Sequence, residues 1–259
     1  MEEYVKKQID LHKRIAINYE KRYSHGYAQL FQNYWNDTII HMISTENNAG
    51  KNVLELGCGT GTFIKELTEK FDKVYGIDIS IDMLKRVDEK SGKFKGAVVG
   101  DAMKSPFQNE SFDIIVCRGV LHHLPELNGS LIELNRILRK GGILIFSEPS
   151  NDSFIVRTAR KIMYKRSDKF SEDDVAFLSR DLFTAIRNSG FELAEAKRFG
   201  FFSYVFAGFP DHFALLAKVP GNEAITRTLI SMDQILSHIP LINRQSLHII
   251  MAVRKVKPL

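Results

Sequence analysis

Short apolar runs alternate with amphipathic segments between residues 51 and 148. Runs of about 4–8 residues rich in β-branched side chains predict strands, and apolar positions that recur every three or four residues predict helices. This alternation predicts a parallel sheet with helices on both faces. The predicted strands are Asn52–Leu56, Lys73–Ile79, Lys95–Val99, Phe112–Cys117 and Ile143–Ser147, and the predicted helices are Thr60–Lys70, Ile81–Lys90 and Glu126–Arg139.

The two ends of the chain depart from this pattern. Residues 1–50 combine many charges with helical apolar spacing, and we expect them to form an N-terminal helical lid. Residues 51–150 would form the core, and residues 151–259 would supply the remaining core strands and a cap at about 199–246, which is too long for a plain loop. Within this last third we predict strands at Phe191–Arg198 and Leu247–Val253, and helices after Asp152, at Asp174–Ser189 and at Glu223–Ser237.

Composition places the chain among ordinary globular proteins, with 44% hydrophobic and 26% charged residues in 259. Two cysteines, Cys58 and Cys117, exclude a disulfide scaffold and favour a reducing, cytoplasmic compartment. We expect no signal peptide, because the first residues are charged throughout, and no transmembrane segment, because no apolar run reaches about 18 residues.

The formal net charge of +5 is unevenly distributed. Residues 51–150 hold 14 basic and 14 acidic residues, whereas residues 151–259 hold 16 and 11. The excess of positive charge is therefore confined to the last third, whereas nucleic-acid-binding proteins are typically basic throughout. A nucleic-acid partner is not expected. Residues 152–170 form a basic amphipathic helix that carries Arg157, Arg160 and Lys161, and it would be a solvated face, bind an anionic acceptor, or touch a membrane surface.

A glycine-rich turn follows the first predicted strand. Gly57, Gly59 and Gly61 let a ligand approach the backbone closely, and Asp78 at the end of the second strand can accept hydrogen bonds from ribose hydroxyls. The pattern indicates a nucleoside cofactor, either a dinucleotide or S-adenosylmethionine. Thr62 stands where the dinucleotide fingerprint has a third glycine, which counts against a dehydrogenase that uses NAD.

The segment VLELGCGTG (53–61) resembles motif I of class I S-adenosylmethionine-dependent methyltransferases. Further matches follow in family order: VYGID (74–78), ISIDML (79–84), GDA (100–102) with SPF and SFD after it, CRGVLHHL (117–124) and LRKGGI (138–143). The nearest subgroup is the small-molecule set that includes ubiquinone- and menaquinone-biosynthesis enzymes (methyltransferase type 11). The resemblance implies a Rossmann-like, seven-stranded, mostly parallel α/β sheet with an antiparallel seventh strand.

The resemblance also implies cofactor-binding roles. Gly57 and Gly59 would line the methionine and ribose, Glu55 would lie near the amino group, and Asp78 would hold the ribose hydroxyls. Adenine would be contacted by Ile79, Met83, Asp101 and the backbone of Ala102. The backbone of Arg118 would lie near the sulfonium. Tyr23 would close over the cofactor or, alternatively, pack between helix and sheet.

Methyl transfer is an in-line displacement, so the enzyme contributes mainly positioning, and a base is needed only where the acceptor must lose a proton. His123, and after it His122, are the candidate catalytic residues; either would otherwise be structural. No metal is expected. The acceptor would be a partly apolar or aromatic small molecule that can carry an anionic group, methylated at O or N rather than C. Its candidate contacts are Arg157, Phe202, Tyr204, Phe206 and His212, although the aromatic run would equally suit the core of the cap. The alternatives are a tRNA- or RNA-modifying methyltransferase and a non-catalytic S-adenosylmethionine-binding module.

Overall fold

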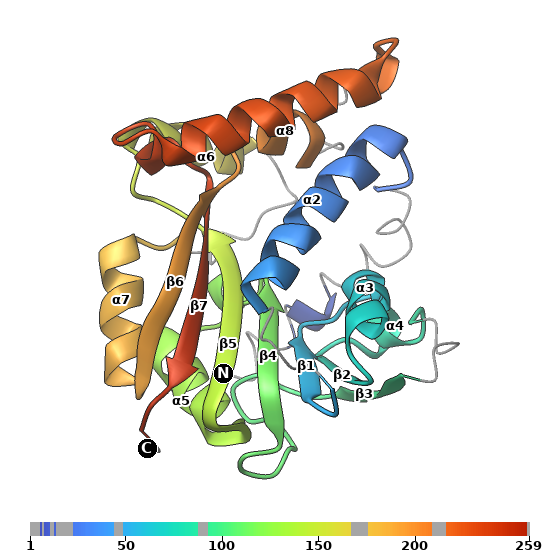
Figure 1. Cartoon of the computed structure of the whole chain (residues 1–259), viewed down its shortest axis with the longest axis vertical. Coiled ribbons are helices and arrows are strands. Elements are labelled where there is room, and N and C mark those ends of the chain that lie inside the picture. Colours follow the sequence, from blue (N-terminus) through green and yellow to red (C-terminus); the bar gives the residue numbers. More distant parts are fainter. Residues whose placement is uncertain are drawn as a thin grey trace.

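A computed structural model of the chain describes residues 6, 8–10, 13, 23–43, 49–87, 93–166, 176–208 and 216–257, with only the backbone for 162–166. Its centre is a seven-stranded sheet in the order β3-β2-β1-β4-β5-β7-β6 (Figure 1). The first five strands pair in parallel, and β7 is antiparallel to both β5 and β6. The predicted topology is therefore confirmed. The strands are β1 Asn52–Leu56, β2 Lys73–Asp78, β3 Phe94–Val99, β4 Phe112–Arg118, β5 Leu138–Pro149, β6 Phe191–Phe199 and β7 His248–Lys255.

Helices cover both faces of the sheet, because its central strands are apolar on both sides. In β4, Ile114 and Val116 belong to the core cluster that includes α2 (Gly26–Ile43) and α3 (Thr62–Lys70). Ile115 and Cys117 face the other cluster, with α5 (Leu127–Ile137) and α7 (Ser179–Asn188). The short α4 (Ile81–Leu84) lies beside β2 and β3.

Two helices lie near the edge at which the parallel strands end. α8 (Asn222–His238) crosses the top of the molecule, and α6 (Phe154–Arg166) lies beside its C-terminal end (Figure 1). These helices belong to segments that interrupt the sheet between β5 and β6 and between β6 and β7. No helix among the described residues is long and apolar enough to cross a membrane.

α2 packs against the core of the protein, and the expectation that residues 1–50 form a lid remains a prediction. Phe31 is fully buried, and its ring centroid lies 5.7–6.4 Å from those of Tyr34, Trp35, Phe199 and Tyr204. These partners come from α2 itself, the end of β6 and the turn after it. α2 is therefore fixed on the sheet by contacts that are distant in sequence, which helical periodicity alone cannot reveal.

Three predicted boundaries shift for local reasons. The helix expected to reach Arg139 ends at Ile137, because Leu138 adopts extended geometry and pairs with Phe112 as the start of β5. The helix expected at Ile81–Lys90 ends at Leu84, and Lys85 caps it. The helix expected from Asp174 begins at Ser179, because Phe177 forms a bridge with Ser150, and residues 174–175 lie outside the described residues.

Replacing Phe31 with alanine tests whether α2 is part of the core. We expect Phe31→Ala to lower the free energy of unfolding by about 3–5 kcal/mol, because it removes a fully buried ring from an aromatic cluster. Denaturant unfolding measures this loss. Phe183→Ala on α7, where the ring is partly exposed, is the control and should cost far less. A loss below about 1 kcal/mol for Phe31→Ala would mean that α2 is not docked as described.

Candidate active site

The glycine turn after β1 leaves open space above the sheet. Gly57 and Gly59 have φ of +67° and +53°, in the left-handed region that favours glycine. A Cβ built on Gly57 would lie 2.5 Å from Val120, whereas one built on Gly59 would meet no atom within 4 Å. Gly57 is therefore required by packing within the protein, and Gly59 borders a space that a ligand can enter.

Asp78 connects this turn to the end of β2. Its Oδ2 accepts a hydrogen bond from the Gly59 N–H at 2.8 Å, and its Oδ1 accepts one from the Ser80 N–H at 2.8 Å. Each carboxylate oxygen can accept a second hydrogen bond. Asp78 therefore fixes the turn and still has acceptor capacity for the ribose hydroxyls assigned to it by the family resemblance.

Glu55 is a buried carboxyl group with an unsatisfied oxygen. It is 3% exposed, and its Oε2 has no hydrogen-bond partner. Burial raises the pKa of Glu55 to about 8, and the negative charges of Asp78 and Glu66 add to the increase, while the nearby Arg118 opposes it. An unsatisfied oxygen on a buried carboxyl group is costly. The amino group of S-adenosylmethionine, a cation with several N–H donors, would supply the missing partner, so Glu55 fits the role implied by the resemblance.

The Arg118 side chain joins the core to α2. Its Nη1 donates to the side-chain oxygens of Gln32 and Asn36, and Asn36 Nδ2 donates to Glu66 Oε1 at 2.6 Å. The guanidinium carbon lies 5.3 Å from the Phe63 ring centroid and 5.5 Å from that of Trp35. The family resemblance implies a backbone role near the sulfonium for this residue, and the structure adds that its side chain holds α2.

The other predicted cofactor residues surround the ends of β2 and β3. Asp101 Oδ1 accepts a hydrogen bond from the Met103 N–H at 2.8 Å, which leaves its second oxygen for an adenine amino group. Ile79 and Ala102 are half-buried, while Met83 is only 1% exposed and has little surface to offer adenine. Tyr23 packs against the core cluster of α2 and α3. The adenine and lid roles of these residues remain predictions.

His122 and Glu148 form a close pair at the ends of β4 and β5. His122 Nδ1 lies 2.7 Å from Glu148 Oε2. Glu148 is fully buried; its Oε1 also accepts the N–H groups of Val120 and Leu121, and its Oε2 accepts that of His122. The carboxylate therefore fixes the whole turn after β4. Because Nδ1–H donates to a carboxylate, Nε2 would carry the lone pair of the neutral ring.

His123 lies next to His122, with 3.9 Å between the ring centroids. The two histidines share the short 3₁₀ turn Leu121–His123, which is why sequence spacing could not distinguish their roles. The carboxylate that contacts His122 lies 26 residues further along the chain, outside the reach of local pattern.

An aromatic cluster lies at the same edge of the sheet. The His248 ring centroid is 4.5 Å from that of Tyr204 and 5.1 Å from that of Trp35, and Trp35 Nε1 donates to Ser147 Oγ at 2.9 Å. His248 is buried, its Nδ1 has no partner, and burial lowers its pKa well below the usual value. Trp35 and His248 were not among the predicted site residues, because only the fold brings α2 and the start of β7 together.

The predicted acceptor residues are separated by the structure. Tyr204 is buried in the aromatic cluster, and Phe206 packs against the same core. Phe202 is half exposed, and its N–H donates to Asp233 of α8. Arg157 lies on α6 with its guanidinium carbon 5.6 Å from the Phe154 ring centroid, and His212 lies outside the described residues.

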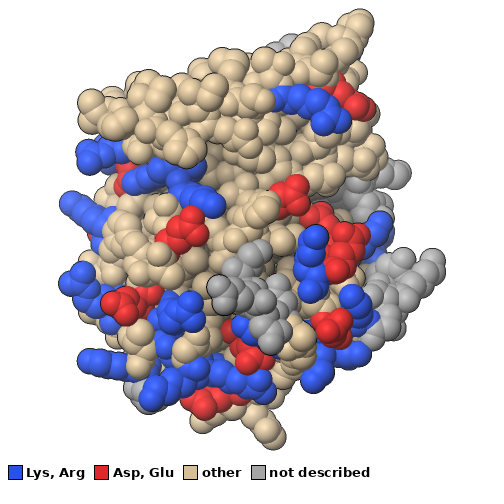
Figure 2. All heavy atoms as spheres, in the orientation of Figure 1, with Lys and Arg blue, Asp and Glu red and all other residues tan. Residues whose placement is uncertain are grey.

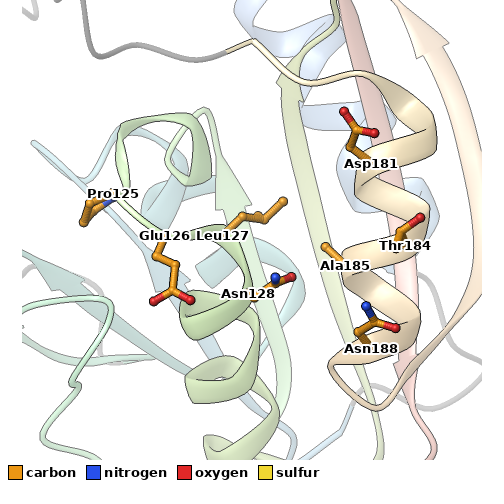
Figure 3. A pocket seen from close by; sticks show the side chains of 8 residues that line it. All are labelled: Pro125, Glu126, Leu127, Asn128, Asp181, Thr184, Ala185 and Asn188. Atoms are coloured by element: carbon orange, nitrogen blue, oxygen red, sulfur yellow. The ribbon is translucent and has the colours of Figure 1, made fainter.

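An open hollow of about 400 Å³ lies between α5 and α7 (Figure 3). Its lining includes Glu126, Leu127 and Asp181 but none of the predicted site residues. It faces the side of the sheet opposite α2. Among the described residues, no group of three or more His, Cys, Asp or Glu side chains could hold a metal ion.

Comparison with known proteins agrees with this geometry. Residues 54–146 match the methyltransferase domain family. An uncharacterized methyltransferase of Anoxybacillus flavithermus is 33% identical over 184 residues, which cover 69% of this chain and 83% of that protein. A demethylmenaquinone methyltransferase of Geobacillus stearothermophilus is 29% identical over 192 residues, covering 64% and 81%. The structure of magnesium protoporphyrin IX methyltransferase from Synechocystis is similar in fold, with a TM-score of 0.65 at 15% identity, covering 97% of this chain and 99% of that one.

These matches define the chain as a class I small-molecule methyltransferase, as the resemblance implied. The protein belongs to the S-adenosylmethionine-dependent methyltransferase family, and S-adenosylmethionine is its cofactor. The predicted family, fold and cofactor are thereby confirmed, and a dehydrogenase that uses NAD is excluded.

The pH dependence of product binding tests the role of Glu55. S-adenosylhomocysteine carries the same ammonium group, which needs an ionised partner. Because the pKa of the unbound carboxyl group is about 8, we expect calorimetry to show about 25-fold weaker binding at about pH 6 than at about pH 7.5. Glu55→Gln should weaken binding and remove this dependence. The control, Glu69→Gln on the exposed side of α3, should change neither.

The same raised pKa has a consequence for stability. In the unfolded chain Glu55 ionises near its ordinary pKa of 4.5, whereas in the folded protein it stays protonated up to about pH 8. Its contribution to stability is therefore fully present below about pH 4.5 and is lost as pH rises through about 8. The unbound Glu55→Gln variant should therefore gain stability relative to the natural protein as pH rises through this window. Unchanged product affinity in Glu55→Gln, with the same pH slope, would contradict the assigned role.

Proposed function

We propose that this methyltransferase modifies an oxygen or nitrogen of a small molecule that is partly apolar or aromatic. His122 acts as the general base, and Glu148 is the positioning residue that orients it. The contact of 2.7 Å between His122 Nδ1 and the buried Glu148 carboxylate carries this proposal. The pair reverses the order suggested by the sequence, in which His123 was preferred.

The geometry gives His122 the features of a base. The Glu148 carboxylate accepts Nδ1–H, which fixes the ring orientation and directs the lone pair to Nε2. Three backbone N–H groups donate to the same carboxylate and hold it in place, so both the ring and its partner have a fixed orientation. Such a base can remove the proton that a hydroxyl or ammonium acceptor must lose when its oxygen or nitrogen is methylated.

The cofactor supplies an activated methyl group on a sulfonium, so the residues around it need only bind and orient. Glu55 would pair with the amino group, Asp78 would accept the ribose hydroxyls, and Gly59 would leave room for the ligand. Arg118 holds α2 against this region through Asn36. Each role follows from an unsatisfied atom, spare acceptor capacity or open space in the chain itself.

Trp35, Tyr204 and His248 support an acceptor with an apolar or aromatic portion. They lie near the edge of the sheet that also carries His122, and the unsatisfied Nδ1 of His248 can bind a polar group of the acceptor. The charge-balanced core argues against RNA as the acceptor. Both cysteines are buried free thiols, which supports a cytoplasmic location.

Incubation with labelled S-adenosylmethionine and a cell extract, followed by identification of the labelled product, would reveal the acceptor. With that acceptor, we expect His122→Gln to lower kcat by about 10²–10⁴ and to change S-adenosylhomocysteine affinity by no more than about threefold. His123→Gln should lower kcat by only a few-fold. His41→Gln, on the exposed side of α2, is the control.

A double-variant cycle tests Glu148 as a positioning residue. Glu148→Gln should lower kcat, and adding it to His122→Gln should cost little more, because the two groups act as a unit. Additive losses would indicate that Glu148 supports only the fold. Full activity in His122→Gln would refute the proposed base, and a product methylated on carbon would refute the proposed oxygen or nitrogen acceptor.

A further inference from the structure

Exposed apolar side chains project where α6 begins and α8 ends. Phe154 and Ile155 are each 71% exposed, Ile235 is 65% exposed and Leu241 is 73% exposed. Ile239 and Ile242 are more than one-third exposed. We call this group of six residues the apolar tip. Exposed apolar patches on a folded surface mark sites of contact with a partner or a membrane.

Hydrogen bonds hold the two parts of the apolar tip together. Ser153 Oγ, directly before α6, donates to Gln245 Oε1 in the turn after α8. The Ser150 N–H donates to the Leu247 carbonyl at 2.8 Å, and Arg160 reaches the same carbonyl at 3.3 Å. The start of α6 and the end of α8, about 80 residues apart in sequence, therefore lie side by side (Figure 1).

Leu241 shows that the exposure is costly to the fold. Its φ of +70° places a bulky residue in the left-handed region, which glycine or asparagine adopts far more readily. A leucine that is both strained and 73% exposed contributes little to packing. Backbone strain of this kind persists where a function requires it.

Charges are distributed around the apolar tip rather than over it. Between Arg227 and Arg244 the only formally charged residue is Asp233, which is buried and bonded to the Ser203 hydroxyl and the N–H groups of residues 201–203. Figure 2 shows most of the upper rim of the molecule without charged side chains. Next to it, Arg157 lies over the Phe154 ring, and Lys161 and Arg244 are exposed.

We propose that the apolar tip docks on an anionic phospholipid surface. Its most exposed members stand at a helix start and at a turn, so they project into solvent and can enter the interfacial layer of a bilayer. The basic side chains beside them complement anionic headgroups. A fluid lipid surface can adapt to separate projecting side chains, whereas a protein partner would need a matching groove.

Docking at this face would bring the edge of the sheet that carries His122 and His248 toward the bilayer. Arg160 donates to the backbone carbonyls of Ser150 and Leu247, the neighbours of Pro149 and His248 at that edge. A partly apolar acceptor dissolved in the membrane would then reach the site without crossing water. This consequence rests on the proposed function, but the docking itself does not.

Vesicle co-sedimentation of the full chain tests the docking. We expect binding to phosphatidylcholine vesicles that contain one-third phosphatidylglycerol, and weak binding to phosphatidylcholine alone. Ile155→Ser with Leu241→Asn should lower the partition coefficient at least about tenfold, because two apolar side chains leave the interface. Lys161→Gln with Arg244→Gln should weaken binding to the anionic vesicles and reduce its sensitivity to salt.

The controls separate docking from misfolding and from self-association. Asparagine accepts the left-handed geometry at position 241, so the double variant should keep its thermal midpoint, and Ile132→Ser, on an exposed face of α5, should bind vesicles like the natural protein. Failure to bind anionic vesicles, equal binding of the double variant, or equal binding to neutral vesicles would overturn the proposal. So would a dimer in sedimentation velocity that Ile155→Ser with Leu241→Asn dissociates, since a second copy would then cover the tip.

Discussion

The fully buried carboxylate of Glu148 is the constraint on which the candidate site depends. A carboxylate without water must find donors, and here it finds them in the N–H groups of Val120, Leu121 and His122. The hydrogen bonds from these three N–H groups determine the path of the chain after β4, and His122 belongs to the same turn. The requirement that stabilises the fold thus also sets the position of the ring. The end of β5 and the turn after β4 cannot move independently while this carboxylate remains buried.

Glu55 presents the opposite case within the same sheet. It is also buried, but Oε2 has no hydrogen-bond partner, and burial raises the pKa of the group. A carboxylate that the protein satisfies serves the architecture, whereas one that it leaves unsatisfied is prepared for a ligand. This difference separates the two glutamates more sharply than burial does, because both are buried in central strands of the sheet.

Local pattern was sufficient to predict the strands, the glycine turn and Asp78, because each depends on residues close together in sequence. Local pattern could not predict contacts between residues that are far apart in the sequence. Trp35 and His248 meet through the antiparallel pairing of β7, and the Arg118 side chain finds its partners on α2. The contact between His122 and Glu148 likewise joins residues 26 positions apart, so local spacing could not reveal it. The aromatic run after β6 divided between core and surface for the same reason: Tyr204 packs on Trp35, while Phe202 stays half exposed.

Several basic residues of the last third form hydrogen bonds or ion pairs within the protein. Arg160 donates to backbone carbonyls, Arg198 pairs with Asp152, and the buried Lys255 donates to the carbonyls of Asn135 and Leu138. These cations serve the fold and offer little to an external anion, because their donors are already engaged. Arg244, two residues after Ile242 of the apolar tip, is exposed instead, and so is Lys161 further along α6. Net charge counts all of these residues equally, but only exposed cations attract an anionic surface strongly, so the position of the charges rather than their sum gives this part of the chain its chemistry.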